Sequence, residues 1–112
     1  MNSEPVRLVL LYDCYGGLLT EKQRSCFDLY YNQDLSLSEI AEECGISRQG
    51  VHDTLTRTEQ TLLSFENVLG CVEKDLRLRE VERRISLLRD RLADRPAEAE
   101  ELSALLSLIE KE

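Results

Sequence analysis

A run of polar side chains between Ser47 and Arg57 has the residue types that read nucleic acid. Arginine can pair with the O6 and N7 atoms of guanine, glutamine can pair with adenine, and a serine at a helix N-terminus can contact phosphate. On one helix such residues share a solvent face, and the candidates for nucleic-acid contact are Ser47, Arg48, Gln49, His52, Thr56 and Arg57. Asp53 lies among them, so an ordinary solvated helix face remains the alternative interpretation.

A helix-turn-helix from about Leu37 to Glu59 would position these side chains. Two helices that cross steeply need a small residue at their contact, a residue that tolerates positive φ in the turn, and apolar residues between them. The predicted helix-turn-helix core is Ile40, Ala41, Gly45, Ile46 and Val51. The spacing of four from Ala41 to Gly45, and of six from Gly45 to Val51, is typical of this motif, and we expect all three to be buried. An ordinary helical corner is the alternative.

Capping signals place further helices around this motif. An apolar stripe predicts a first helix over Val6–Tyr15, and Gly16-Gly17 predicts a left-handed stop. Two capping boxes open the second helix, which runs to about Tyr31, and a short third helix, which runs to about Glu43. These boxes pair Thr20 with Gln23 and Ser36 with Glu39, and Ser47 is the expected N-cap of the fourth helix. The predicted fold class is therefore all-α.

The residues after Gly70 form a charged, leucine-studded stretch. Apolar residues there alternate spacings of three and four, as in a coiled coil, and the seam consists of Leu78, Val81, Ile85, Leu88 and Leu92. Pro96 interrupts the pattern and residues 97–112 resume it, which predicts a helical hairpin. We therefore expect a helix-turn-helix domain over 1–69 and an amphipathic hairpin over 70–112 that serves dimerisation or partner binding.

The leucine seam predicts a homodimer, because one protomer offers little to cover it. A dimer would also suit DNA binding, since one helix-turn-helix reads a single half-site and a pair reads two. The alternative is that the second helix of the hairpin folds back across Pro96 and buries the seam within the protomer.

The net charge of −8 lowers the expectation of tight nucleic-acid binding. Residues 1–66 hold 11 acids and 5 bases, so the candidate reading helix lies in the more acidic part of the chain. We therefore expect weak binding to DNA, or binding to RNA. The alternative is a protein-interaction module that keeps the helix-turn-helix as a scaffold and binds through the seam.

The sequence offers little for catalysis, metal binding or membrane insertion. His52 is the single histidine, and the four cysteines match no metal motif, so we expect buried free thiols at Cys14, Cys26, Cys44 and Cys71. We expect no enzyme activity, no catalytic residue, no metal and no cofactor. No stretch approaches the roughly 20 apolar residues of a membrane span, and the first seven residues do not form a signal peptide. The expected location is cytoplasmic.

The run from Val6 to about residue 72 closely resembles the YlxM family of bacterial proteins. The resemblance rests on Tyr15-Gly16, Leu19 to Arg24, Tyr30-Tyr31 and Ser47-Arg48-Gln49. It implies a fold similar to region four of sigma factors and a regulatory protein. It also implies a link to the signal recognition particle and its components, because genes of this family commonly neighbour those of the particle protein and its receptor. The sequence departs from the family pattern at Gly50, His52 and Thr56, where Ala, Tyr and Lys are typical.

Overall fold

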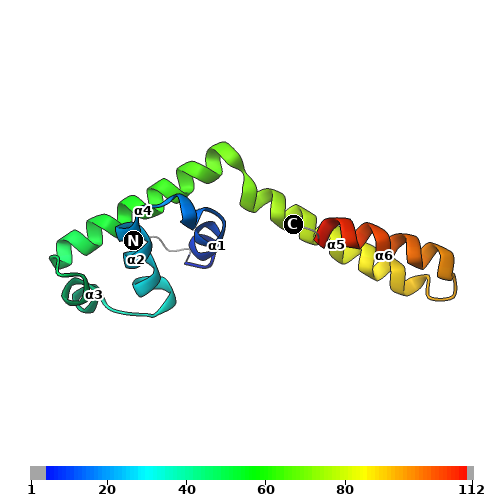
Figure 1. Cartoon of the computed structure of the whole chain (residues 1–112), viewed down its shortest axis with the longest axis horizontal. Coiled ribbons are helices and arrows are strands. Elements are labelled where there is room, and N and C mark those ends of the chain that lie inside the picture. The colour runs from blue at the N-terminus through cyan, green and yellow to red at the C-terminus, as the bar shows by residue number, and fades with distance from the viewer. Residues whose placement is uncertain (1–4, 111–112) are drawn as a thin grey trace. The chain divides into compact units, whose positions relative to one another are not determined.

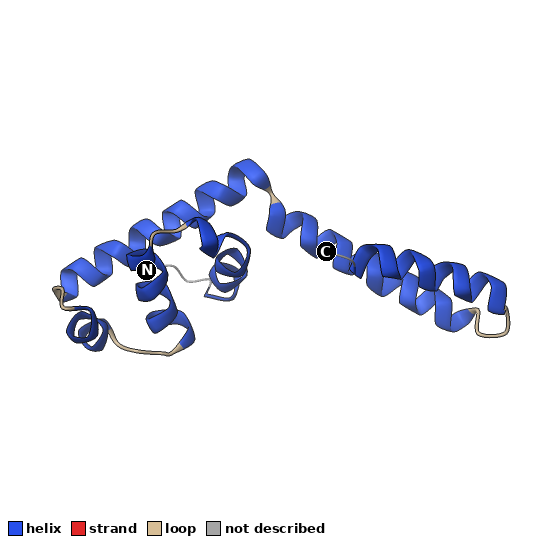
Figure 2. Ribbon diagram, viewed as in Figure 1, coloured by secondary structure: helices blue, strands red, loops and turns tan. Residues whose placement is uncertain are grey.

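The computed structural model describes residues 5–110, and every regular element in that range is helical (Figures 1 and 2). The predicted all-α class is confirmed. The elements are α1 (Pro5–Tyr15), η1 (Gly16–Leu18), α2 (Glu21–Phe27), η2 (Asp28–Asn32), α3 (Leu37–Cys44), α4 (Arg48–Leu69), α5 (Cys71–Arg91) and α6 (Pro96–Glu110). Residues 1–4, which contribute to the signal-peptide expectation, and 111–112, the end of the expected hairpin, lie outside the described residues. No described helix is long and apolar enough to cross a bilayer.

The predicted capping signals are confirmed. The side-chain oxygens of Thr20 and Ser36 each accept a hydrogen bond from the backbone N–H three residues later. In return, the side-chain oxygens of Gln23 and Glu39 accept a hydrogen bond from the backbone N–H of Thr20 and Ser36. These reciprocal bonds satisfy donors that a helix start otherwise leaves free. The second helix continues without a break from α2 into the π-helical turn η2, so it reaches Asn32.

The predicted left-handed stop at Gly16-Gly17 is wrong. Both glycines belong to the 3₁₀ turn η1, which the Leu19 N–H closes by donating to the Gly16 carbonyl at 3.1 Å. Among the described residues, the glycines with positive φ are Gly45 and Gly70, which end α3 and α4. The 3₁₀ turn thus continues the backbone hydrogen bonding beyond the end of α1 without a residue in the left-handed conformation.

The described residues up to Val72 form one compact unit, in which α1, α2 and α3 pack against the long helix α4 (Figure 1). One apolar cluster joins α1, α2 and the middle of α4, and its buried members are Leu8, Leu11, Tyr15, Leu19, Phe27, Leu62 and Val72. The second cluster lies around the helix-turn-helix and buries Cys26, Ile40, Val51 and Leu55. Tyr12 stacks on Phe27, with ring centroids 4.5 Å apart.

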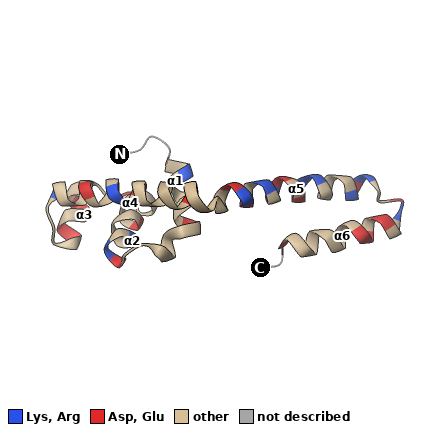
Figure 3. Ribbon diagram, turned by 90° about the horizontal axis from the view of Figure 1, so that it is seen from above, with Lys and Arg blue, Asp and Glu red and all other residues tan. Residues whose placement is uncertain are grey.

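The described residues from Glu73 onward form the second compact unit, which consists of most of α5 and all of α6. The two helices run side by side in opposite directions, joined by a short turn before Pro96 (Figures 1 and 3). The Arg89 guanidinium donates to the Ser103 hydroxyl at 3.3 Å and ties one helix to the other. The helical hairpin predicted from the periodicity around Pro96 is present.

The expectation of four buried thiols is wrong for three of them. Cys14, Cys44 and Cys71 are exposed, and Cys26 is fully buried in the helix-turn-helix cluster. Burial raises the pKa of the Cys26 thiol, and the neighbouring Cys44 raises it further.

Candidate nucleic-acid interface

The N-terminal turn of α4 begins at the predicted cap. Ser47 has extended backbone angles, and its Oγ accepts a hydrogen bond from the Gly50 N–H at 2.9 Å. A lone pair of this hydroxyl is therefore engaged by the helix, while the hydroxyl proton stays available for a phosphate oxygen. An alanine Cβ at position 50 would lie 3.1 Å from this oxygen, so glycine leaves the cap unhindered.

Of the three residues expected to be buried at the helix crossing, Val51 is buried, Ala41 is half-buried and Gly45 is exposed. Ile40 and Val51 are fully buried, and Ala41 and Ile46 pack against the same cluster while half-buried. Gly45 is exposed rather than buried, and it has φ +67° at the end of α3. Its contribution is conformational, because a side chain in this left-handed region would be strained even though the space around it is open.

The six candidate contact residues lie within the cap and first three turns of α4. Arg48, Gln49 and Arg57 are exposed, whereas His52 and Thr56 are half-buried. At about 1.5 Å per residue, Ser47 to Arg57 spans about 15 Å of helix axis, which fits within a major groove that admits a helix. The structure thus gathers these residues on one surface segment, and contact with nucleic acid there stays a prediction.

Asp53 lies in the middle of this surface and engages its neighbours. The Gln49 Nε2 donates to the Asp53 Oδ1 at 3.0 Å, and the Nδ1 of His52 lies 3.7 Å from the same oxygen. The amide that could read adenine is thereby turned toward a carboxylate on its own helix. A nucleic acid would have to compete for Gln49 and approach a negative charge.

Acidic residues also border the start of α4. The exposed side chains of Glu42 and Glu43 on α3 lie near the turn that leads into the reading helix, and the acidic positions of α3 are visible in Figure 3. Arg48 and Arg57 are the arginines of α4. The surface is therefore a mixed one, unlike the continuous basic stripe typical of tight DNA binders.

Sequence reasoning missed the polar anchor that holds α4 in place. The Tyr31 hydroxyl donates to the Glu59 Oε2 at 2.7 Å, and Glu59 is only 5% exposed. Burial raises the pKa of Tyr31 far above its ordinary value, and the hydrogen bond to the Glu59 carboxylate raises it further. The two residues are 28 positions apart in the sequence, so no local sequence pattern predicts their hydrogen bond.

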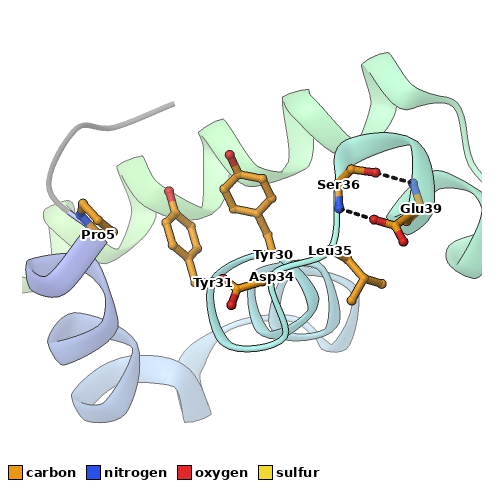
Figure 4. Close-up of a pocket in the computed structure, with 7 residues that line it drawn as sticks. All are labelled: Pro5, Tyr30, Tyr31, Asp34, Leu35, Ser36 and Glu39. Atoms are coloured by element: carbon orange, nitrogen blue, oxygen red, sulfur yellow. Dashed lines mark hydrogen bonds between the residues drawn. The ribbon is translucent and has the colours of Figure 1, made fainter.

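An open pocket of about 510 Å³ lies between the start of α1, η2 and the start of α3 (Figure 4). Its lining residues are Pro5, Tyr30, Tyr31, Asp34, Leu35, Ser36 and Glu39. Several of its polar groups already serve the fold, because Tyr31 binds Glu59 while Ser36 and Glu39 cap each other. The hydrogen bonds from Ser36 lower the pKa of Glu39. The pocket is thus a by-product of the junction between η2 and α3.

The predicted seam on α5 is only partly covered within the hairpin. Ile85 and Leu92 are half-buried, while Leu78, Val81 and Leu88 are 43%, 46% and 46% exposed. On α6, Leu106 is buried at 5% exposed. The fold-back of α6 therefore leaves apolar surface open along α5.

Known proteins similar to this chain share one family. A family model described as "Putative helix-turn-helix protein, YlxM / p13 like" matches residues 2–104, and so extends well beyond residue 72, where the resemblance read from the sequence ended. A UPF0122 protein of Bacillus mycoides (strain KBAB4) is 40% identical over 111 residues, which cover 99% of this chain and 98% of that one. A UPF0122 protein of Thermoanaerobacter sp. (strain X514) is 45% identical over 98 residues, or 84% of each chain.

A third relative, a UPF0122 protein of Desulforamulus reducens, is 56% identical over 68 residues, or 61% of this chain and 58% of that one. The two longer matches run through both compact units, so the similarity covers the hairpin as well as the helix-turn-helix. The chain belongs to the UPF0122 family of YlxM / p13-like helix-turn-helix proteins.

Proposed function

We propose that this chain is a regulatory protein whose sigma-factor-like helix-turn-helix binds nucleic acid weakly, and that it acts in the signal recognition particle pathway. The single observation that carries the nucleic-acid part is the first turn of α4, where a capped helix N-terminus presents exposed Arg48 and Gln49. Helix N-termini favour anions, and these two side chains are base readers. The link to the pathway comes from the family resemblance alone.

The acidic surroundings set the strength of this binding. With 11 acids and 5 bases in residues 1–66, few phosphates can be neutralised, so the affinity should depend on a small number of contacts. We therefore propose a protein that binds nucleic acid together with a partner, or as a dimer whose two reading helices act together. Self-association is assigned to the hairpin seam of Leu78, Val81, Ile85, Leu88 and Leu92. We place the protein in the cytoplasm and propose that it carries out no catalysis.

The second candidate function is a protein-interaction module without direct nucleic-acid contact. The observation that favours it is the Gln49–Asp53 hydrogen bond, which satisfies a reading side chain within its own helix. In this case the helix-turn-helix would be a scaffold, and the exposed leucines of the hairpin would bind the partner.

Salt dependence separates the two candidates. Fluorescence anisotropy should be measured with a randomised 30-base-pair duplex and with a randomised single-stranded RNA, at about 50 and 200 mM salt. Binding through phosphates should weaken steeply with salt, and the variant Arg48→Ala, Gln49→Ala should lose most of it. A matched control, Arg79→Ala, Gln60→Ala, removes the same residue types elsewhere. Binding that neither salt nor the Arg48 and Gln49 substitutions change would rule out the α4 reading surface.

A pull-down from lysate with and without nuclease tests the second candidate independently. Partners retained after nuclease treatment are held by protein contacts, and partners that disappear are held through nucleic acid. Capture of signal recognition particle components by the wild-type chain would support the pathway assignment, and their absence from both samples would contradict it.

A further inference from the structure

One face of the hairpin of α5 and α6 gathers four exposed apolar residues. The half-buried or buried residues mark the side of each helix that faces the other helix, and they include Glu82 and Arg89 on α5 and Leu106 and Ile109 on α6. Arg89 hydrogen-bonds across the hairpin to Ser103. Four exposed apolar residues each stand one position before such a residue, and they are Val81, Leu88, Leu105 and Leu108. Leu76, Leu78 and Leu87 of α5 are also exposed and lie outside this set. These four are 46%, 46%, 45% and 71% exposed.

Helix geometry places these four side chains on the same side of the hairpin. A residue one position earlier than a reference residue is rotated by about 100° around the helix axis, in the same sense for every helix viewed from its N-terminus. α5 and α6 run in opposite directions (Figure 3) and face each other through the Arg89–Ser103 hydrogen bond. The same rotation therefore turns both sets toward one face. The residues one position after Glu82, Arg89, Leu106 and Ile109 are polar, and these residues, Arg83, Asp90, Ser107 and Glu110, turn toward the opposite face. Leu87, one position after the half-buried Ser86, is an exposed apolar residue outside the apolar face.

The two helices carry opposite net charge. Residues 71–91 hold 7 bases and 5 acids, whereas residues 96–110 hold 4 acids and no base. Charged residues also border the apolar face on its outer edges. Arg84 lies one turn from both Val81 and Leu88, and Glu101 lies one turn before Leu105, so both border the face away from the other helix of the hairpin.

We propose that a second copy of this chain covers the apolar face, so that two hairpins form a four-helix bundle in which α5 of each protomer packs against α6 of its partner. A two-fold axis parallel to the helices produces this arrangement, whereas an axis across them would pair α5 with α5 and α6 with α6. The charges select the first arrangement, because it sets Arg84 of each protomer beside the acidic helix of the partner and avoids two acidic helices in contact.

This inference deepens the self-association in the proposed function by naming the face, the neighbours and the symmetry. It makes no use of nucleic-acid binding. A failure of the bundle therefore leaves the reading surface of α4 untouched, and a failure of nucleic-acid binding leaves the bundle untouched.

The first experiment is sedimentation equilibrium of the full chain with circular dichroism on the same samples. Wild-type protein should be dimeric at tens of micromolar. Leu105→Asp or Val81→Asp should give a helical monomer, because a charge would be buried only in the pair. Ser107→Asp, on the opposite face, is the matched control and should stay dimeric. A wild-type chain that is monomeric at 100 μM, or a Ser107→Asp variant that dissociates as readily as Leu105→Asp, would overturn the proposal.

Charge exchange tests the arrangement without burying a charge. Arg84→Glu alone and Glu101→Arg alone should each raise the dimer dissociation constant by about ten-fold at low salt, and the double variant should return it to near the wild-type value. Arg79→Glu is the control, since Arg79 pairs with Asp75 four residues earlier just as Arg84 pairs with Glu80. It should leave dimerisation unchanged. A double variant that is no tighter than the single variants would overturn the pairing of α5 with α6 of the partner.

Discussion

The Tyr15 hydroxyl donates a hydrogen bond to the Glu66 Oε1 at 2.5 Å, and each of the two oxygens also accepts a hydrogen bond from a backbone N–H at the start of α5. The Cys71 N–H donates to the Tyr15 hydroxyl at 2.9 Å, and the Val72 N–H donates to the Glu66 Oε1 at 3.0 Å. Tyr15 is 2% exposed. The first two backbone donors of α5 are thus capped by side chains from α1 and α4, which replaces the usual local N-cap.

Substitution of Tyr15 by Phe should loosen the start of α5. The ring would still fill its place beside Phe65, but the Cys71 N–H would lose its acceptor and Glu66 would lose a donor. Hydrogen exchange, read by mass spectrometry on peptides that cover residues 68–76, should become several-fold faster in Tyr15→Phe. Peptides from α3 should keep the wild-type rate. Unchanged protection at 71 and 72 would mean that the capping bonds do not hold this junction.

Alkaline pH should destabilise the helix-turn-helix unit through the buried Tyr15 and the half-buried Tyr31. Burial, followed by hydrogen bonds to Glu66 and Glu59, raises the pKa of Tyr15 and of Tyr31 far above the value near 10 of an unfolded chain. A raised folded-state pKa contributes stability that is fully present below about pH 10 and is lost as pH rises above it.

Thermal melts between pH 8 and 11 check this sign. The melting temperature of the wild-type chain should fall above pH 10. The double variant Tyr15→Phe, Tyr31→Phe should have a lower melting temperature than the wild type at pH 8, since the buried Glu59 loses the Tyr31 hydroxyl as a donor. Its melting temperature should fall less steeply as pH rises. A variant whose melting temperature falls as steeply as that of the wild type would assign the alkaline loss to other groups, such as lysines.

The sequence predicts those parts of this fold that local chemistry controls. The caps at Thr20, Ser36 and Ser47 are confirmed because each depends on a side chain and a backbone group three residues apart. At Gly16-Gly17 the sequence predicts the wrong turn, because two glycines permit a left-handed residue without requiring one. The tyrosine–glutamate pairs could not be predicted, because they join residues 28 and 51 positions apart.

The sequence predicts where the candidate contact residues lie, but not which hydrogen bonds they make. Helical spacing alone places Arg48, Gln49 and Arg57 on one exposed stretch of α4. The hydrogen bond from Gln49 to Asp53 depends on side-chain rotamers, which periodicity does not specify. Likewise, heptad spacing identifies the seam on α5, but only the hairpin shows which of its leucines α6 leaves uncovered.

Substitution of Ala41 by Leu should destabilise the helix-turn-helix. Ala41 is half-buried against the cluster of Ile40, Val51 and Leu55, so the extra atoms would have to push α3 away from α4. Overpacking of this kind costs about 1 to 3 kcal/mol. Urea unfolding measures the change, and Glu43→Leu, which adds a leucine at an exposed position of the same helix, is the control. Equal midpoints for the wild type and Ala41→Leu would place the crossing of α3 and α4 elsewhere.

Substitution of Asp53 by Asn should strengthen nucleic-acid binding. Asparagine keeps an oxygen that can accept from Gln49, so the side-chain arrangement is preserved while a negative charge leaves the reading surface. Removal of one repulsive charge near phosphates should raise the affinity for a randomised duplex by about two- to five-fold at 50 mM salt, and by less at 200 mM because salt screens the interaction. Glu98→Gln, which removes the same charge from an exposed position of α6, controls for net charge alone. If Asp53→Asn and Glu98→Gln change the affinity measured by anisotropy equally, Asp53 acts only through the net charge of the chain. That result would contradict direct contact between nucleic acid and the first turns of α4.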